Sequence, residues 1–188
     1  MSPRSSTKIL VLVLASVLVA ACGKDIDPDQ ALQEGLAQQQ AGNLDAAAEQ
    51  YQLVLDVRPS DKFANYNLGV IEQADGRAQL AEGYYRAALD TDPNFVSALF
   101  NLAILRTGVG ATQEAIDLYL RVIELQPDYA AAHFNLGILY RDAGKPGLSG
   151  KYLNEALALD PSLADRLTTT PVVPGTTTSS EPPIATPS

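Results

Sequence analysis

One fixed spacing, of thirty-four positions, recurs along most of the chain and limits what it can fold into more than any other feature. Four prolines keep this spacing: Pro59, Pro93, Pro127 and Pro161. Four glycines keep it as well: Gly42, Gly76, Gly110 and Gly144. A third row is Asn67-Leu68-Gly69, Asn101-Leu102-Ala103 and Asn135-Leu136-Gly137. Because three independent rows share one period, the chain is expected to stack similar structural units that bury their apolar sides against one another.

Each unit carries the local signals of two helices. A glycine lies between consecutive prolines, which predicts a turn between a first and a second helix, and each proline predicts the end of a second helix. The repeated region is rich in alanine and leucine, which favours helix. Asp27 and Pro28 supply a cap and a first-turn proline for the first helix. We therefore predict an all-α fold of eight short helices in four helix-turn-helix units: 28–61, 62–95, 96–129 and 130–163.

This repeating pattern resembles the tetratricopeptide repeat (TPR) over about residues 28–163. The close-packing glycine of that family is matched by Gly35, Gly69 and Gly137, with Ala103 in the third unit. The family's alanine and aromatic of the second helix are matched by Ala47 with Tyr51, Ala81 with Tyr85, and Ala115 with Tyr119. The tryptophan place departs from the pattern and holds Ala31, Asn65, Leu99 and His133. Further departures are Glu34 in the first unit and Ser149 with Leu153 in the fourth. The resemblance implies a right-handed helical solenoid.

The resemblance also implies where a partner would bind, because the first helix of each TPR unit lines the concave face. Residues four apart share one helix face. The first row on that face is Leu32, Tyr66, Phe100 and Phe134, and the second is Leu36, Val70, Ile104 and Ile138. The third is Gln39, Gln73, Thr107 and Arg141. We predict an apolar partner-binding groove formed by Tyr66, Val70, Phe100, Ile104, Phe134 and Ile138, with Gln73 and Arg141 at its edge. The alternative is that the aromatic stripe packs within the solenoid.

The predicted groove narrows the kind of partner. Chaperone-binding TPR domains hold a peptide's terminal carboxylate with lysines and arginines at groove positions, where this chain has Tyr66, Val70 and Phe100. Carboxylate capture is therefore not expected. An amphipathic helix or an extended apolar segment suits such a groove better.

The first residues are typical of an export signal. Arg4 and Lys8 precede an almost uninterrupted apolar run over residues 9–21, which is shorter than the roughly 20 residues of a membrane span. Val19-Ala20-Ala21-Cys22 then resembles the lipobox of bacterial lipoproteins, in which the cysteine is acylated, for example with palmitate, and the preceding peptide is removed. We predict a signal peptide at residues 1–21, lipidation of Cys22 and a short tether at residues 22–27. The alternative is an ordinary buried cysteine behind an uncleaved anchor.

The C-terminal end departs from the repeat. Residues 168–188 are low in complexity, rich in threonine and proline, and carry one charge, at Glu181, which predicts a disordered tail. Only residues 162–167 lie between Pro161 and this tail, which we expect to be too few for a capping helix. Tyr152, Leu157 and Leu159 would then be partly uncovered. Either a second copy packs there as a homodimer, or the open edge is tolerated.

Composition excludes several functions. The net charge is −9, which gives no electrostatic basis for binding nucleic acid. One cysteine and one histidine are too few for a zinc site, and no glycine-rich phosphate loop precedes a helix. We expect no metal, no cofactor and no catalytic residues, and we expect His133 to be structural.

These features together predict a lipid-anchored scaffold or adaptor. It would sit on a bacterial cell membrane or outer membrane, face the periplasm or the exterior, and bind a protein during assembly of an envelope complex. An alternative is a surface-exposed lipoprotein that binds a non-protein or host ligand.

Overall fold

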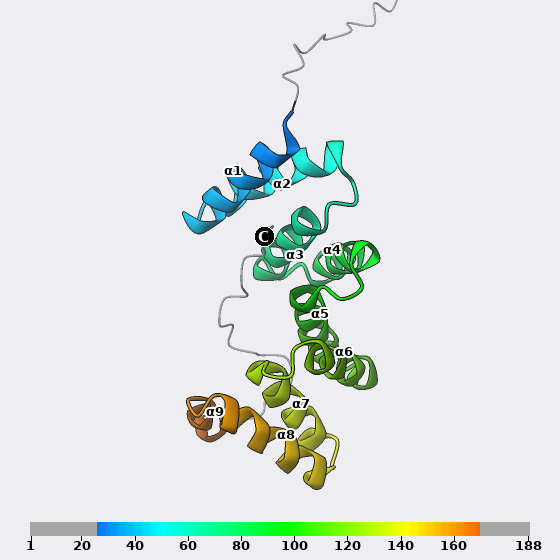
Figure 1. Ribbon diagram of the computed structural model, residues 1–188, viewed down its shortest axis with the longest axis vertical. Coiled ribbons are helices and arrows are strands. Elements are labelled where there is room, and N and C mark those ends of the chain that lie inside the picture. The colour runs from blue at the N-terminus through cyan, green and yellow to red at the C-terminus, as the bar shows by residue number, and fades with distance from the viewer. Residues whose placement is uncertain (1–25, 170–188) are drawn as a thin grey trace, which may run out of the picture.

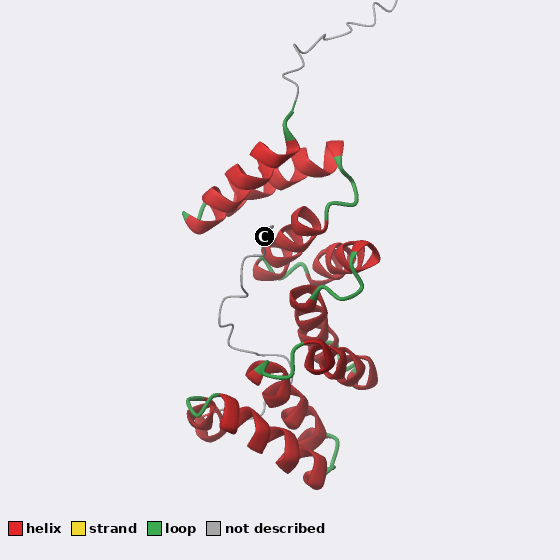
Figure 2. Ribbon diagram, in the orientation of Figure 1, coloured by secondary structure: helices red, strands yellow, loops and turns green. Residues whose placement is uncertain are grey.

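The computed structural model describes residues 26–169, which form helices and connecting loops and no strands (Figure 2). The helices of this stretch are α1 (Pro28–Gln40), α2 (Leu44–Val57), α3 (Lys62–Ala74), α4 (Ala78–Thr91), α5 (Val96–Gly108), α6 (Thr112–Leu125), α7 (Ala130–Asp142), α8 (Pro146–Leu159) and α9 (Leu163–Thr169). The chain curves, with α3, α5 and α7 on the inner side of the bend and α4 and α6 on the outer side (Figure 1). No described helix is both long and apolar enough to cross a membrane.

The turn inside each unit depends on one glycine. Gly42, Gly76, Gly110 and Gly144 have φ of 80°, 75°, 74° and 68°, and they are the described residues with positive φ. A helix that ends in this left-handed conformation favours a residue without a Cβ atom. The first turn shows the bonding pattern, since the Asn43 amide donates to the Gln38 carbonyl and the Gly42 amide to the Gln39 carbonyl. The row of glycines therefore ends every first helix and reverses the chain.

A second kind of glycine brings the two helices of a unit together. A Cβ atom on Gly35 would lie 2.6 Å from Cε1 of Tyr51, and one on Gly69 would lie 2.6 Å from Cε1 of Tyr85. Both tyrosines are fully buried. Their rings thus occupy the volume that a side chain on the first helix would need, and they form the centre of the first two units.

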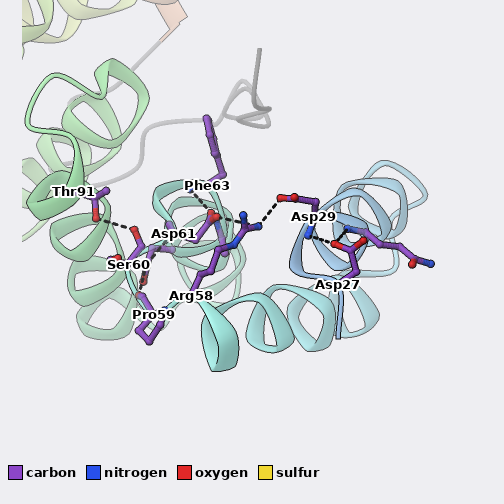
Figure 3. A network of polar contacts seen from close by, with 11 residues as sticks. Asp27, Asp29, Arg58, Pro59, Ser60, Asp61, Phe63 and Thr91 are labelled. Carbon is purple, nitrogen blue, oxygen red and sulfur yellow. Dashed lines mark hydrogen bonds and ion pairs between the residues drawn. The ribbon is translucent and has the colours of Figure 1, made fainter. Parts of the chain in front are cut away.

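The loop between units 1 and 2 is fixed by polar contacts (Figure 3). Arg58 pairs with Asp29 of α1, at 2.8 Å, and with Asp61, at 3.5 Å. Asp61 also caps α3 by accepting hydrogen bonds from two backbone amides of its first turn. The hydroxyl of Thr91, at the end of α4, donates to the Ser60 carbonyl at 2.8 Å. One loop is therefore held by α1, α3 and α4, which sets the position of unit 1 relative to unit 2.

The expectation that the solenoid ends without a capping helix is wrong. Residues 163–169 form α9, so this part of the chain has nine helices rather than eight. The carboxylate of Asp160 accepts from the Ser162 amide and hydroxyl, at 3.0 and 2.7 Å, which starts the turn. Leu163 is then buried against Phe134, with Leu167 beside it. Two leucines four residues apart are enough to hold a seven-residue helix on an existing apolar surface.

Helix α9 also affects two expectations, that the last unit is uncovered and that the tail starts at residue 168. The last unit is partly covered by α9, although Leu159 still has 44% of its surface exposed. The helix continues to Thr169, past the predicted start of the tail. The predicted signal peptide at residues 1–21, the lipidated Cys22 and the tail after Thr169 lie outside the described residues and stay predictions.

Candidate partner-binding surface

Three of the predicted groove residues, Tyr66, Val70 and Phe134, are buried and do not present an open surface, which corrects the prediction. Tyr66 is fully buried, with its ring centroid 5.1 Å from that of Phe95 and 5.8 Å from that of Tyr85. Phe134 is 5% exposed and packs against Leu163. Tyr66 is covered by Phe95, which lies just before α5, and Phe134 is covered by Leu163, which begins α9. The pattern of one helix face does not reveal such a cover. Val70, at 8% exposed, belongs to the same core as Tyr66.

Gln73 serves a tyrosine of its own unit. The hydroxyl of Tyr85 donates to the side-chain oxygen of Gln73 at 2.7 Å, and Asn101 donates to the hydroxyls of Tyr66 and Tyr85 at 3.2 and 3.4 Å. Burial raises the pKa of the Tyr85 hydroxyl far above its ordinary value of 10. This cluster joins units 2 and 3 through neutral hydrogen bonds, so Gln73 is a structural residue as well as part of the inner surface.

The same pairing recurs in unit 1 and is lost in unit 4. Tyr51 donates to Gln39 at 2.7 Å, as Tyr85 does to Gln73. In unit 4 the tyrosine is replaced by Leu153, and the glutamine by Arg141, whose side chain is exposed and pairs with Asp142 at 3.2 Å. Arg141 is therefore exposed and makes no hydrogen bond of the kind that Gln39 and Gln73 make.

Several apolar side chains remain partly exposed on the first helices and their entry loops. We call six of them the aromatic face: Phe63, Phe95, Phe100, Ile104, Tyr129 and Ile138. Three of them, Phe100, Ile104 and Ile138, belong to the predicted groove. The rings lie in contact, with centroids of Phe63 and Phe95 5.8 Å apart and those of Phe100 and Tyr129 4.8 Å apart. Its residues belong to α3, α5 and α7 and to the loops before α5 and α7, and these three helices lie on the inner side of the bend (Figure 1).

Sequence reasoning missed Phe63, Phe95 and Tyr129, although a signal for two of them is present. Phe95 and Tyr129 are separated by one full repeat period and precede α5 and α7, at the place that Asp61 holds before α3. Asp27 and Asp61 cap their helices through side-chain hydrogen bonds, whereas Phe95 and Tyr129 make none. Replacing such a cap costs about 1 kcal/mol. An aromatic residue at the N-cap position departs from the preference for Ser, Thr, Asp or Asn there. Departures of this kind are expected at functional sites.

One end of the aromatic face carries a cation that is already neutralised. Lys62 lies 5.1 Å from the ring centroid of Phe63 and 5.4 Å from that of Phe95. Its ammonium group also pairs with Asp92 at 2.6 Å. The hydrogen bond from Lys62 holds the pKa of the Asp92 carboxyl below its usual value. The Asp92 carboxyl is thus ionised at neutral pH and is paired with the cation at this end of the face.

His133 and Asn65, which occupy the same place in units 4 and 2, hold the loops before their helices. His133 contacts the Pro127 carbonyl through Nε2 at 2.9 Å and Glu155 through Nδ1 at 3.1 Å. Asn65, at the same place in unit 2, likewise donates to the Pro59 carbonyl at 3.1 Å. Among the described residues no group of three or more histidine, cysteine or acidic side chains could hold a metal ion.

A right-handed stack of helix pairs with an apolar inner face defines a solenoid of the kind that binds other proteins. Three models of one family match the chain: tetratricopeptide repeat models at residues 32–95 and 130–163, and a TPR repeat model at residues 110–144. The chain belongs to the tetratricopeptide repeat family. It is a TPR solenoid of the protein–protein interaction scaffold class.

Solved structures of TPR proteins have the same fold. A crystal structure of MamA superposes with a TM-score of 0.67 at 21% identity, over 74% of this chain and 81% of that one. MamA from Desulfovibrio magneticus RS-1 gives a TM-score of 0.64 at 21% identity, over 72% and 77% of the two chains. PilF from Pseudomonas aeruginosa gives a TM-score of 0.64 at 28% identity, over 73% of this chain and 64% of that one. A comparison with curated protein sequences finds no match.

Proposed function

We propose that this protein is a membrane-anchored TPR adaptor of the bacterial cell envelope, which holds a protein partner on its aromatic face. Lipidated Cys22 would fix it to the cell membrane or the outer membrane, facing the periplasm or the exterior. Residues 23–27 leave only a short tether before α1, so the solenoid would work close to the membrane surface. The partner would be captured during assembly of an envelope complex.

The observation that carries this proposal is that, among the first helices, α5 and α7 have an aromatic residue at the N-cap position where α1 and α3 have an aspartate. Phe95 and Tyr129 each replace a capping residue and lie partly exposed beside other rings. Burying apolar surface in a partner stabilises a complex by roughly 25 cal/mol per Å² before the costs of association. Aromatic residues are enriched where most of the binding energy of an interface is concentrated.

The chemistry of the face favours one type of partner. Its six members are apolar or phenolic, and the lysine at its edge is paired with Asp92. An amphipathic helix or an extended apolar segment could bury its side chains between the rings. The likeness in fold to PilF, at 28% identity, supports a protein–protein interaction scaffold.

The partner is tested with a matched pair of double variants in native membranes. Phe95→Ser with Tyr129→Ser removes two rings from the face, and serine at these two N-cap positions can cap α5 and α7. Leu80→Ser with Leu120→Ser removes two exposed leucines from the second helices. After cross-linking and purification, we expect a discrete protein to be lost from the first variant and kept by the second. Equal capture of the protein by both variants would mean that the aromatic face does not bind it.

The anchor is tested separately with Cys22→Ala. We expect the wild-type chain to fractionate with membranes and to incorporate labelled palmitate, and the variant to lose the label. Unchanged labelling of the variant would contradict lipidation at this residue.

A further inference from the structure

We infer that the aromatic face is also bound by the chain's own C-terminal segment, residues 170–188, which competes with the partner. This inference rests on the proposed function of the face and adds a regulation to it. Four observations carry it: the place where α9 ends, the length of the segment, its composition and the chemistry of the face.

The first observation is the position of α9. Leu163 lies one repeat period after Tyr129 and packs on Phe134, as Tyr129 packs on Phe100. Helix α9 therefore begins where the first helix of a fifth unit would begin. The guanidinium carbon of Arg166 lies 4.9 Å from the ring centroid of Phe134, which keeps α9 against α7. The chain thus leaves Thr169 from the layer of inner helices that carries the aromatic face.

The second observation is length. Nineteen residues, 170–188, follow α9. In a polyproline conformation they would span about 59 Å, at roughly 3.1 Å per residue. Packed helices lie about 10 Å apart, so α3 is at most about 40 Å from α7 along the stack. The segment is long enough to run past units 4 and 3 and reach unit 2.

The third observation is composition. The segment contains Pro171-Val172-Val173-Pro174, and later Pro182-Pro183-Ile184 and Pro187, with Glu181 as its one charge. Prolines limit the conformations of the free segment and lower the entropy lost on binding. Proline-rich segments bind shallow surfaces lined with aromatic rings, and polar side chains beside the rings satisfy their backbone groups.

The face supplies both elements. Phe95, Phe100 and Tyr129 offer partly exposed rings, and the inner helices α3 and α7 carry the partly exposed amides of Gln73 and Asn135. The segment brings one acid, Glu181, and one acid near the face, Asp92, is already paired with Lys62. Binding would therefore bury valine, isoleucine and proline and bring a single negative charge to the face.

Tethering makes weak binding sufficient. A short linked segment has an effective concentration on the order of 1 mM at its site. If the free segment bound with a Kd of about 0.25 mM, it would occupy the face about four-fifths of the time. The apparent affinity for a partner would then be lowered about fivefold.

Two disulfide pairs in the full chain test the inference. Ile184→Cys is combined with Ile104→Cys on the face, and, as the control, with Leu120→Cys on α6 of the same unit. Under mild oxidation in membranes, we expect the intrachain disulfide to Ile104→Cys to form about tenfold faster than the control disulfide, because binding raises the local concentration. Pro182→Ser with Pro183→Ser should lower that rate, whereas Thr176→Ser with Thr177→Ser should not.

Other results would overturn the inference. Equal rates for the two pairs mean that the segment has no preferred site, and disulfides only between chains mean that a second copy occupies the face. A chain that ends at Thr169 provides the second measurement, and we expect it to capture about fivefold more partner in membranes. If the disulfide test fails while capture still depends on Phe95 and Tyr129, only this inference falls. If capture never depends on those two residues, the proposed function itself is wrong.

Discussion

Replacing Gly69 by alanine should destabilise the solenoid, although alanine is the better helix former. In an unconstrained helix, replacing glycine by alanine stabilises the helix by about 1 kcal/mol. Here the new methyl group would lie 2.6 Å from Cε1 and 2.7 Å from Cδ1 of Tyr85. Carbon atoms pack at about 3.5–4.0 Å, so the ring would have to move by roughly 1 Å. That ring is fully buried, and its hydroxyl is bonded to Gln73 and Asn101.

The expected size follows from these contacts. Overpacking of this kind costs up to about 3 kcal/mol, and a weakened hydrogen bond adds about 0.5 kcal/mol. After the gain in helix propensity, the net loss should be about 2 kcal/mol, or about 6 °C in Tm for a domain of this size.

A matched variant separates packing from propensity. Gly83 is helical and exposed, and a Cβ atom there would meet nothing within 4 Å. Gly83→Ala should therefore stabilise the protein by up to about 1 kcal/mol. Urea unfolding followed by circular dichroism measures both variants. A Gly69→Ala protein as stable as Gly83→Ala would refute the close approach of Tyr85 to α3.

Three further outcomes are expected. Burial raises the pKa of the Tyr119 hydroxyl to about 12, so the contribution of this shift to stability is full below pH 10 and is lost as the pH rises to 12. Tyr119→Phe should therefore move the midpoint of alkaline unfolding to higher pH, and an unchanged midpoint would contradict this role of Tyr119. The ion pairs from Arg86 and Arg106 hold the pKa of the Glu114 carboxyl below its usual value. Glu114→Gln should therefore reduce the slope with which the free energy of unfolding falls as the pH drops below about 4.5, and unfolding measured over a pH series with an unchanged slope would contradict this. Leu163→Ala should lower the free energy of unfolding by about 2–3 kcal/mol, because it uncovers the apolar surface of the last unit. A loss no greater than that of Leu159→Ala, at an exposed position, would mean that α9 does not bury this surface.

The repeat period predicted the fold well, because its signals are local. Glycine at φ of 68–80° ends each first helix, and a proline follows each second helix. These features depend on residues a few positions apart, and the sequence displays them directly.

The binding surface was harder to predict, because its exposure depends on neighbouring units. Tyr66 and Phe100 occupy the same place in their units, yet Tyr66 is fully buried under Phe95 while Phe100 stays partly exposed beside Tyr129. Helix periodicity assigns both residues to one face and cannot show what the next unit places over them. The co-occurrence of glutamine with tyrosine in units 1 and 2 was a usable signal for the pairing of Gln73 with Tyr85.

Helix α9 was missed because it is short and its evidence lies outside its own residues. A seven-residue segment has no amphipathic pattern of its own that exceeds chance. The sequence indicates α9 only through the repeat spacing, because Leu163 lies 34 residues after Tyr129 and continues the row of Asp61, Phe95 and Tyr129. Counting that row one unit further would have predicted a packed residue there.

The central claim, that the aromatic face binds a protein partner, is tested most directly by photo-cross-linking from single positions in native membranes. A photoreactive phenylalanine analogue at Phe100 lies on the face, and the same analogue at Leu120 lies on α6 of the same unit. We predict a discrete protein adduct from Phe100 that is absent from Leu120 and lost when Tyr129→Ser is added. Adducts from Leu120 alone, or from both positions alike, would contradict the claim.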